Sequence, residues 1–163
     1  MTIGSFSATC PKSTFTAKVV KNPISAGKAK LSVTSQTLSG CSLPASTGVT
    51  LKSITAINTP WNGVITAKRV LTIKGTTKSK PVGVKAVISA AGQTLTCVFT
   101  ASVTSGTASN KANTVTFKNQ KLTLDTTKSS SLCGVAGKTA TFSAIYGPVR
   151  DISVAKHPKV FVK

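Results

Sequence analysis

The segment Phe15-Thr16-Ala17-Lys18-Val19 begins the stretch that decides the fold of this chain. Its apolar residues alternate with polar ones, as expected for a β-strand that buries one face. The second half of the chain repeats the pattern in Phe99-Thr100-Ala101-Ser102-Val103. The stretches Phe15 to Leu38 and Phe99 to Leu122 therefore indicate one β unit that is used twice.

Both copies break their alternation at the same place. Val33 is odd-numbered and Leu38 is even-numbered, and Phe117 and Leu122 differ in the same way. A β-bulge inserts one extra residue into a strand and would turn the later residues back toward the core. We predict bulges near Ser35-Gln36 and Asn119-Gln120.

Turn residues punctuate the rest of the chain. Asn62-Gly63 has the composition of a two-residue hairpin turn. Ala91-Gly92 separates two further apolar stretches and predicts a hairpin of residues 82–90 and 93–103. The segment Val160-Phe161-Val162 is expected to form a terminal edge strand.

These patterns predict an all-β fold of about nine to eleven strands, with turns at roughly 8–12-residue spacing. We prefer a β-sandwich of two pseudo-repeated, immunoglobulin-like or jelly-roll-like halves, and a closed β-barrel is the alternative. The chain is expected to be a single domain, 1–163, with repeats at about 10–61 and 93–149. The alternative division is into two small β domains, 1–77 and 81–163.

Four cysteines flank the two copies, at Cys10, Cys41, Cys97 and Cys133. The chain has no C-x-x-C motif and only one histidine, which argues against a zinc site. Disulfides formed in an oxidising compartment fit better. The repeat favours one bridge within each copy, Cys10–Cys41 and Cys97–Cys133, over the other pairings. We expect neither a metal nor a cofactor.

The charge is strongly unbalanced, with 21 Lys and Arg residues against 2 acidic residues and a net charge of +19. Solubility alone needs far less charge, so we expect an anionic partner. Lysine binds phosphates without reading sequence, and the chain has only two arginines for reading bases. The candidate contact residues are Lys18, Lys28, Lys30, Lys78, Lys80, Lys118 and Lys121.

Residues for acid–base catalysis are scarce. Asp125 is expected to cap a turn, and Asp151 to form a local ion pair with Arg150. His157 stands before a proline near the C-terminus and is expected to be an exposed loop residue. Because no nucleophile elbow or paired-carboxylate pattern accompanies them, we expect no enzymatic activity.

The second half of the chain resembles small secreted all-β, disulfide-bonded proteins of actinobacteria such as streptomycetes. The resemblance lies in Thr96 to Ala101, Asn113 to Gln120, Thr139 to Tyr146 and the ending Val160-Phe161-Val162. It implies export and disulfides, but no particular activity. Met1-Thr2-Ile3-Gly4 lacks the features of a signal peptide, so an exported chain would be the mature form. No apolar run is long enough to span a bilayer.

The sequence therefore predicts a secreted, non-enzymatic protein that binds an anionic polymer or surface. Cell-wall polymer, extracellular DNA and membrane head groups are equally compatible with the lysines. A protein-interaction module, such as an inhibitor or a subunit of a secreted complex with an acidic partner, is the alternative. That alternative would use an exposed apolar patch near Trp61. A cationic antimicrobial protein is a weaker third possibility.

Overall fold

A computed structural model describes residues 1–3, 6–25, 27–135 and 137–162. The fold is all-β, as the alternating apolar residues predict. The strands are β1 (Thr2–Ile3), β2 (Phe6–Ser7), β3 (Lys12–Ser25), β4 (Lys28–Ser39), β5 (Val49–Ile57), β6 (Trp61–Thr66), β7 (Val70–Lys74), β8 (Val82–Ala90), β9 (Gln93–Ala101), β10 (Val103–Ser109), β11 (Thr114–Leu124) and β12 (Thr139–Tyr146). Two short 3₁₀ helices, η1 (Ala45–Thr47) and η2 (Ser131–Val135), interrupt them.

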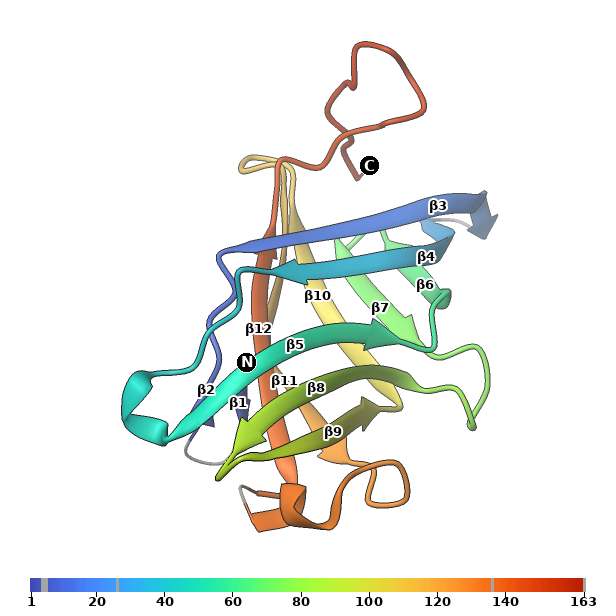
Figure 1. Ribbon diagram of the computed structural model, residues 1–163. Coiled ribbons are helices and arrows are strands. Elements are labelled where there is room, and N and C mark those ends of the chain that lie inside the picture. The colour runs from blue at the N-terminus through green and yellow to red at the C-terminus, as the bar shows by residue number, and fades with distance from the viewer. Residues whose placement is uncertain (4–5, 26, 136, 163) are drawn as a thin grey trace.

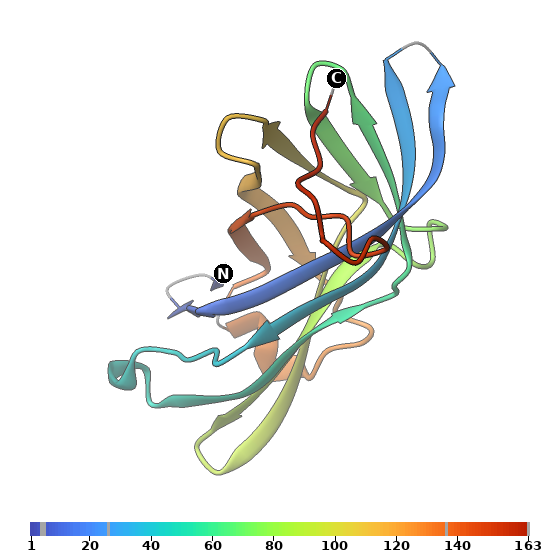
Figure 2. The same ribbon diagram turned by 90° about the horizontal axis from the view of Figure 1, so that it is seen from above.

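The described strands join into one strongly curled sheet (Figures 1 and 2). Its main path runs β2-β1-β12-β11-β10-β7-β6-β4-β3, and β9, β8 and β5 branch from β11. The sheet curls so far that β3 and β4 pass across the end of β12, and the result is a half-barrel (Figure 1). This shape lies between the sandwich and the closed barrel. Strands from both halves of the chain share the sheet, and the division into domains stays a prediction.

Both expected bulges are confirmed at equivalent positions. In the β3–β4 pair, Thr16 faces Ser35 while Ala17 faces Val33, so Thr34 is the extra residue. In the β11–β12 pair, the register shifts between Phe117 and Gln120. The bulges return Leu38 and Leu122 to the inner side of the sheet, where both pack in the core.

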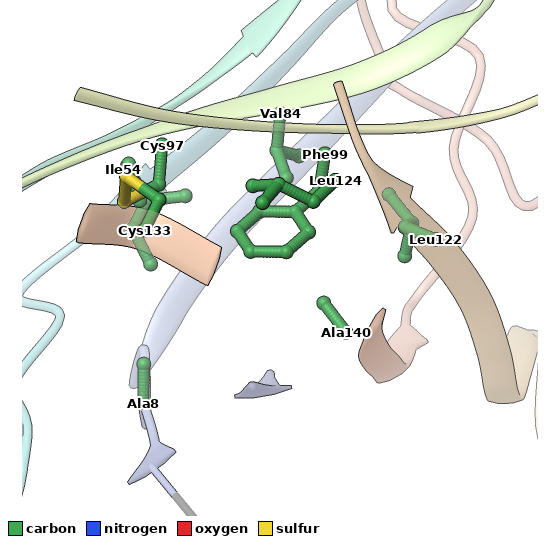
Figure 3. Packing of buried hydrophobic residues seen from close by; sticks show 10 residues of the cluster. Ala8, Ile54, Val84, Cys97, Phe99, Leu122, Leu124, Cys133 and Ala140 are labelled. Atoms are coloured by element: carbon green, nitrogen blue, oxygen red, sulfur yellow. A yellow bond between two sulfur atoms is a disulfide. The ribbon is translucent and has the colours of Figure 1, made fainter. Parts of the chain in front are cut away.

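Two hydrophobic clusters fill the inside of the sheet. One collects Phe99, Leu122, Leu124 and their neighbours beneath β8 and β9, and it includes the Cys97–Cys133 bridge (Figure 3). The other is built around Trp61 and Phe117, inside the curl of β3, β4, β6, β7 and β12. Burial of these side chains is the main source of stability, because removing apolar area from water is the dominant favourable term in folding.

Both predicted disulfides are present. Cys10 bonds Cys41 and Cys97 bonds Cys133, each within its own copy of the repeat. Cys97 and Cys133 are buried in the first cluster, whereas Cys10 and Cys41 are half-buried at its margin. Each bridge closes a loop of similar length, with sequence separations of 31 and 36.

The two predicted hairpin turns have different outcomes. Ala91 and Gly92 connect β8 to β9, and both have positive φ, as a type I′ turn requires. The turn at Asn62-Gly63 is wrong, because both residues lie within β6. Gly63 faces Leu31 across the β4–β6 ladder, and a Cβ on Gly63 would lie 3.2 Å from that of Leu31. Close strand packing, and not a turn, accounts for this glycine.

The expected terminal strand is also wrong. The segment 160–162 pairs with no strand and is attached by asparagine side chains at the β10–β11 turn (Figure 1). Asn110 Nδ2 donates to the Val162 carbonyl at 2.6 Å, and the Val162 N–H donates back to Asn110 Oδ1 at 2.9 Å. Asn113 Nδ2 donates to the Val160 carbonyl at 2.8 Å. Side-chain amides therefore supply most of the attachment, and one backbone hydrogen bond adds to it, from the Val160 N–H to the Val149 carbonyl at 3.0 Å.

Candidate functional site

Five lysines project from the outer face of β3, β4 and β7. On β4, Leu31 and Val33 point inward, so Lys28 and Lys30 point outward, and both are exposed. Residues directly opposite in an antiparallel pair share one face. This surface, which we call the lysine face, comprises Lys18, Lys21, Lys28, Lys30 and Lys74.

The strand register fixes the arrangement of the lysine face. Lys21 lies directly opposite Lys30, because the β3–β4 ladder shifts between Val19 and Lys21. Lys18 lies opposite Ser32, which lies opposite Asn62, which in turn lies opposite Lys74 on β7. Lys28 lies opposite Ser25 on one side and Thr66 on the other. The side chains between the lysines are therefore neutral and mostly polar.

Opposed like charges make the lysine face electrostatically unfavourable by itself. Side chains directly opposite on neighbouring strands have Cβ atoms about 4.5–5.5 Å apart, and like charges at this spacing destabilise a sheet. Neither Lys21 nor Lys30 has a carboxylate partner, since the one ion pair among the described residues joins Lys128 and Asp125. A bound anion would relieve the repulsion between the two ammonium groups.

The structure brings together only part of the predicted contact set. Lys18, Lys28 and Lys30 share the lysine face. Lys78 and Lys80 lie in the exposed turn that follows β7, beyond Lys74. Lys118 and Lys121 are exposed on β11, and β6, β7 and β10 separate them from β4. The two copies of the repeat therefore do not place their lysines side by side.

Sequence reasoning missed two members of the lysine face. Lys21 falls in a stretch that looks like a loop because Pro23 follows it, yet β3 continues to Ser25. Lys74 ends a short strand, and only the order β4-β6-β7 places it on the same face as Lys18. The alternation around Leu71 and Ile73 could have indicated that Lys74 is exposed, but not which lysines are its neighbours.

Trp61 cannot serve as an exposed contact residue. Its side chain is 2% exposed and lies in the second core cluster, where the indole N–H donates to the Ile57 carbonyl at 3.0 Å. The expected apolar patch near Trp61 is therefore a misinterpretation of a core residue. The flanking Asn58 to Pro60 supplies the turn, and β6 begins at Trp61 itself.

The two carboxylates serve local turns at opposite ends of the molecule. Asp125 follows β11, and Asp151 lies in the C-terminal segment at the other end (Figure 1). The Thr127 hydroxyl donates to Asp125 at 2.7 Å and, with Lys128 nearby, lowers the pKa of that carboxyl. The Ser153 hydroxyl and N–H lower the pKa of Asp151 in the same way.

The C-terminal segment corrects one further expectation. Arg150 does not pair with Asp151 but donates to the His157 carbonyl at 3.1 Å. His157 is exposed, as predicted. Asp125 and Asp151 therefore cannot act as a carboxylate pair in one cleft, because each belongs to a separate end of the half-barrel.

A groove of about 510 Å³ opens between the start of β3 and β12. Leu38, Ile54 and Val84 form its apolar inner wall, and exposed Lys12 and Ser143 stand at its margin. The described residues that line it include no acid and no histidine. Across the described chain, no group of three or more His, Cys, Asp or Glu residues could hold a metal ion.

Comparisons with protein-family models, curated proteins and solved structures found no match to this chain. The resemblance to secreted actinobacterial proteins therefore stays a prediction. Within the described residues, no helix is long and apolar enough to cross a membrane.

Proposed function

We propose that this is a secreted, non-enzymatic cationic protein that binds an anionic polymer or surface outside the cell. The observation that carries the proposal is that the described basic side chains are exposed and that almost none of them has an acidic partner. Every described lysine and arginine is exposed, and the described residues contain a single ion pair. The positive charge is thus available to a partner instead of being neutralised within the fold.

Two further features support the proposal. Both cysteine pairs are bonded, and disulfides persist mainly in oxidising compartments such as the cell exterior. The separated carboxylates and the groove without acids or histidine offer no set of residues for acid–base catalysis. Binding through surface charge needs no such set, and the exposed lysines provide the charge for it.

Chromatography on immobilised heparin tests the proposal, since heparin is a general polyanion. We expect retention at low salt and elution as salt rises, because lysine contacts release counterions. Passage through the column without retention at low salt would contradict the proposal.

A pair of charge-matched variants tests where binding occurs. Lys18→Gln/Lys21→Gln/Lys30→Gln removes charges from the lysine face, and Lys111→Gln/Lys128→Gln/Lys156→Gln removes the same charge elsewhere. We expect the first variant to elute at clearly lower salt than the second. Equal elution of the two variants would show that net charge alone determines retention, and that the lysine face is not the binding site.

A further inference from the structure

The lysine face has a repeat along the strand as well as a charge. Lys28 and Lys30 are two residues apart on β4 and point the same way, so their Cα atoms are about 6.7 Å apart. Lys21 stands directly opposite Lys30, and Lys18 stands one outward position further along, opposite Ser32. A linear ligand that runs along the β3–β4 pair therefore meets ammonium groups at successive outward positions.

We propose that the lysine face binds a linear phosphodiester chain laid along β3 and β4. Two residues of an extended strand and one repeat of a phosphodiester backbone contain the same number of backbone bonds. Successive phosphates can therefore match successive outward side chains on β4. Lys28 and Lys30 each take one phosphate, and Lys21 contacts the same phosphate as Lys30 from the opposite strand.

The neutral neighbours fit this ligand as well. Ser32, Asn62 and Thr66 lie beside the lysines in the ladder and offer hydroxyl and amide groups to phosphate oxygens. The aromatic residues of these strands, Phe15 and Trp61, pack in the core, so no platform is present for stacking bases. The site thus recognises the backbone of the polymer and not its bases.

The inference rests on the proposed function and narrows it to one chemical class. Single-stranded nucleic acid and poly(glycerol phosphate) share this backbone chemistry. Since the site has no stacking platform, we expect poly(glycerol phosphate) to bind at least as tightly as oligothymidylate of equal phosphate number. The reverse order would assign the site to nucleic acid. Hyaluronan, which carries one carboxylate per disaccharide, is the control polyanion, because its charges are spaced differently from the phosphates of a phosphodiester chain.

Fluorescence anisotropy with labelled oligothymidylate and poly(glycerol phosphate), competed with hyaluronan, measures the preference. We expect Lys28→Gln/Lys30→Gln to weaken phosphodiester binding about tenfold and to reduce the slope of log affinity against log salt by about 1.4. Lys78→Gln/Lys80→Gln removes the same charge at the same sequence spacing, but from a turn. This control should change the affinity less than about threefold.

A rearranged variant tests the spacing itself. Lys30→Ser/Ser32→Lys keeps the net charge and the outward direction, but it moves the second ammonium group from position 30 to position 32, so that the two lysines no longer occupy successive outward positions. We expect it to lose the preference for phosphodiesters over hyaluronan, while thermal unfolding shows that the fold is intact.

Three results would overturn the inference. These are equal losses in the two double variants, a rearranged variant that binds as the wild type does, and hyaluronan that competes as well as the phosphodiesters. Any of them, combined with retention on heparin, would leave the general polyanion function standing. Absence of binding to every polyanion would remove both proposals.

Discussion

At the scale of single residues, Tyr146 links β12 to β3 and β4 across the curl of the sheet. Its hydroxyl oxygen accepts from Ser13 Oγ on β3 at 3.1 Å and from Gln36 Nε2 on β4 at 2.5 Å. Its ring packs against those of Phe15 and Phe117, with centroids 5.3 and 5.9 Å away. β12 is not hydrogen-bonded to β3 or β4 as a neighbouring strand, so this side-chain cluster links them.

The only tyrosine of the chain gives a direct test of this cluster. Burial raises the pKa of Tyr146 above 10.0, although the hydrogen bonds from Ser13 and Gln36 act in the opposite direction. The fold therefore favours the neutral phenol, and its contribution to stability is complete below the unfolded pKa. That contribution is lost as pH rises through the folded pKa. Absorbance titration should show tyrosinate forming at higher pH in the native protein than in urea.

The variant Tyr146→Phe provides the control for this titration. It leaves the Gln36 amide without its acceptor, so we expect a loss of about 1–2 kcal/mol in the free energy of unfolding at neutral pH. The part of the alkaline destabilisation that arises from the phenol should disappear. Coincident titration curves for native and unfolded protein would show that the phenol is not buried as described.

At the scale of elements, local patterns predicted strands that pack against the core on one side. Phe15 and Val33 reveal their strands because one face is buried, and the bulges follow from the same phase. The pair Asn62-Gly63 led to a wrong turn prediction, because Asn-Gly is typical of hairpin turns, whereas Gly63 is required here for close packing between strands. The distinction depends on Leu31, which meets Gly63 only through the tertiary structure.

The candidate site was less predictable than the strands that carry it. Exposure of Lys28 and Lys30 follows from alternation alone. Their relation to Lys21 depends on a register shift near Val19, and their relation to Lys74 depends on β6 lying between β4 and β7. The residue types in a short stretch of sequence do not encode either relation, because the packing of the whole chain sets strand register and strand order.

The β8–β9 turn offers a test at this scale. Ala91 occupies the left-handed region with φ 48°, which costs a residue with a Cβ about 1–2 kcal/mol unless it is Asn or Asp. Ala91→Asn should therefore raise the free energy of unfolding by about 0.5–1 kcal/mol in urea titrations. Gly92→Ala, which places a Cβ in a second left-handed position, should lower it. An unchanged or lower stability for Ala91→Asn would contradict a type I′ turn here.

At the scale of the whole molecule, positive charge opposes folding and favours binding. With a net charge of +19, folding brings like charges together, and almost no carboxylates are present to offset them. The two bridges and the two core clusters must offset this repulsion. Repulsion among the surface lysines therefore destabilises the free protein, and an anionic partner would relieve that repulsion.

The dependence of stability on salt follows from this balance. Screening shortens the reach of the charges from about 30 Å at 0.01 M salt to about 10 Å at 0.1 M. We therefore expect the unfolding temperature to rise with sodium chloride over this range, the opposite of a protein held together by surface ion pairs. Differential scanning fluorimetry at constant pH measures it. A flat or falling unfolding temperature would show that repulsion among the lysines is negligible.

The variant Lys21→Gln locates part of this effect on the lysine face. It removes the charge opposite Lys30, so it should raise the free energy of unfolding by about 0.2–1 kcal/mol at low salt. The gain should vanish at high salt, where the pair is already screened.

The same variant should bind polyanions more weakly, because Lys21 is also a proposed contact for the anionic ligand. Lys128→Gln, which breaks the one ion pair found among the described residues, should show no such gain at low salt. A stability gain that persists at high salt would show that packing, and not charge, is responsible.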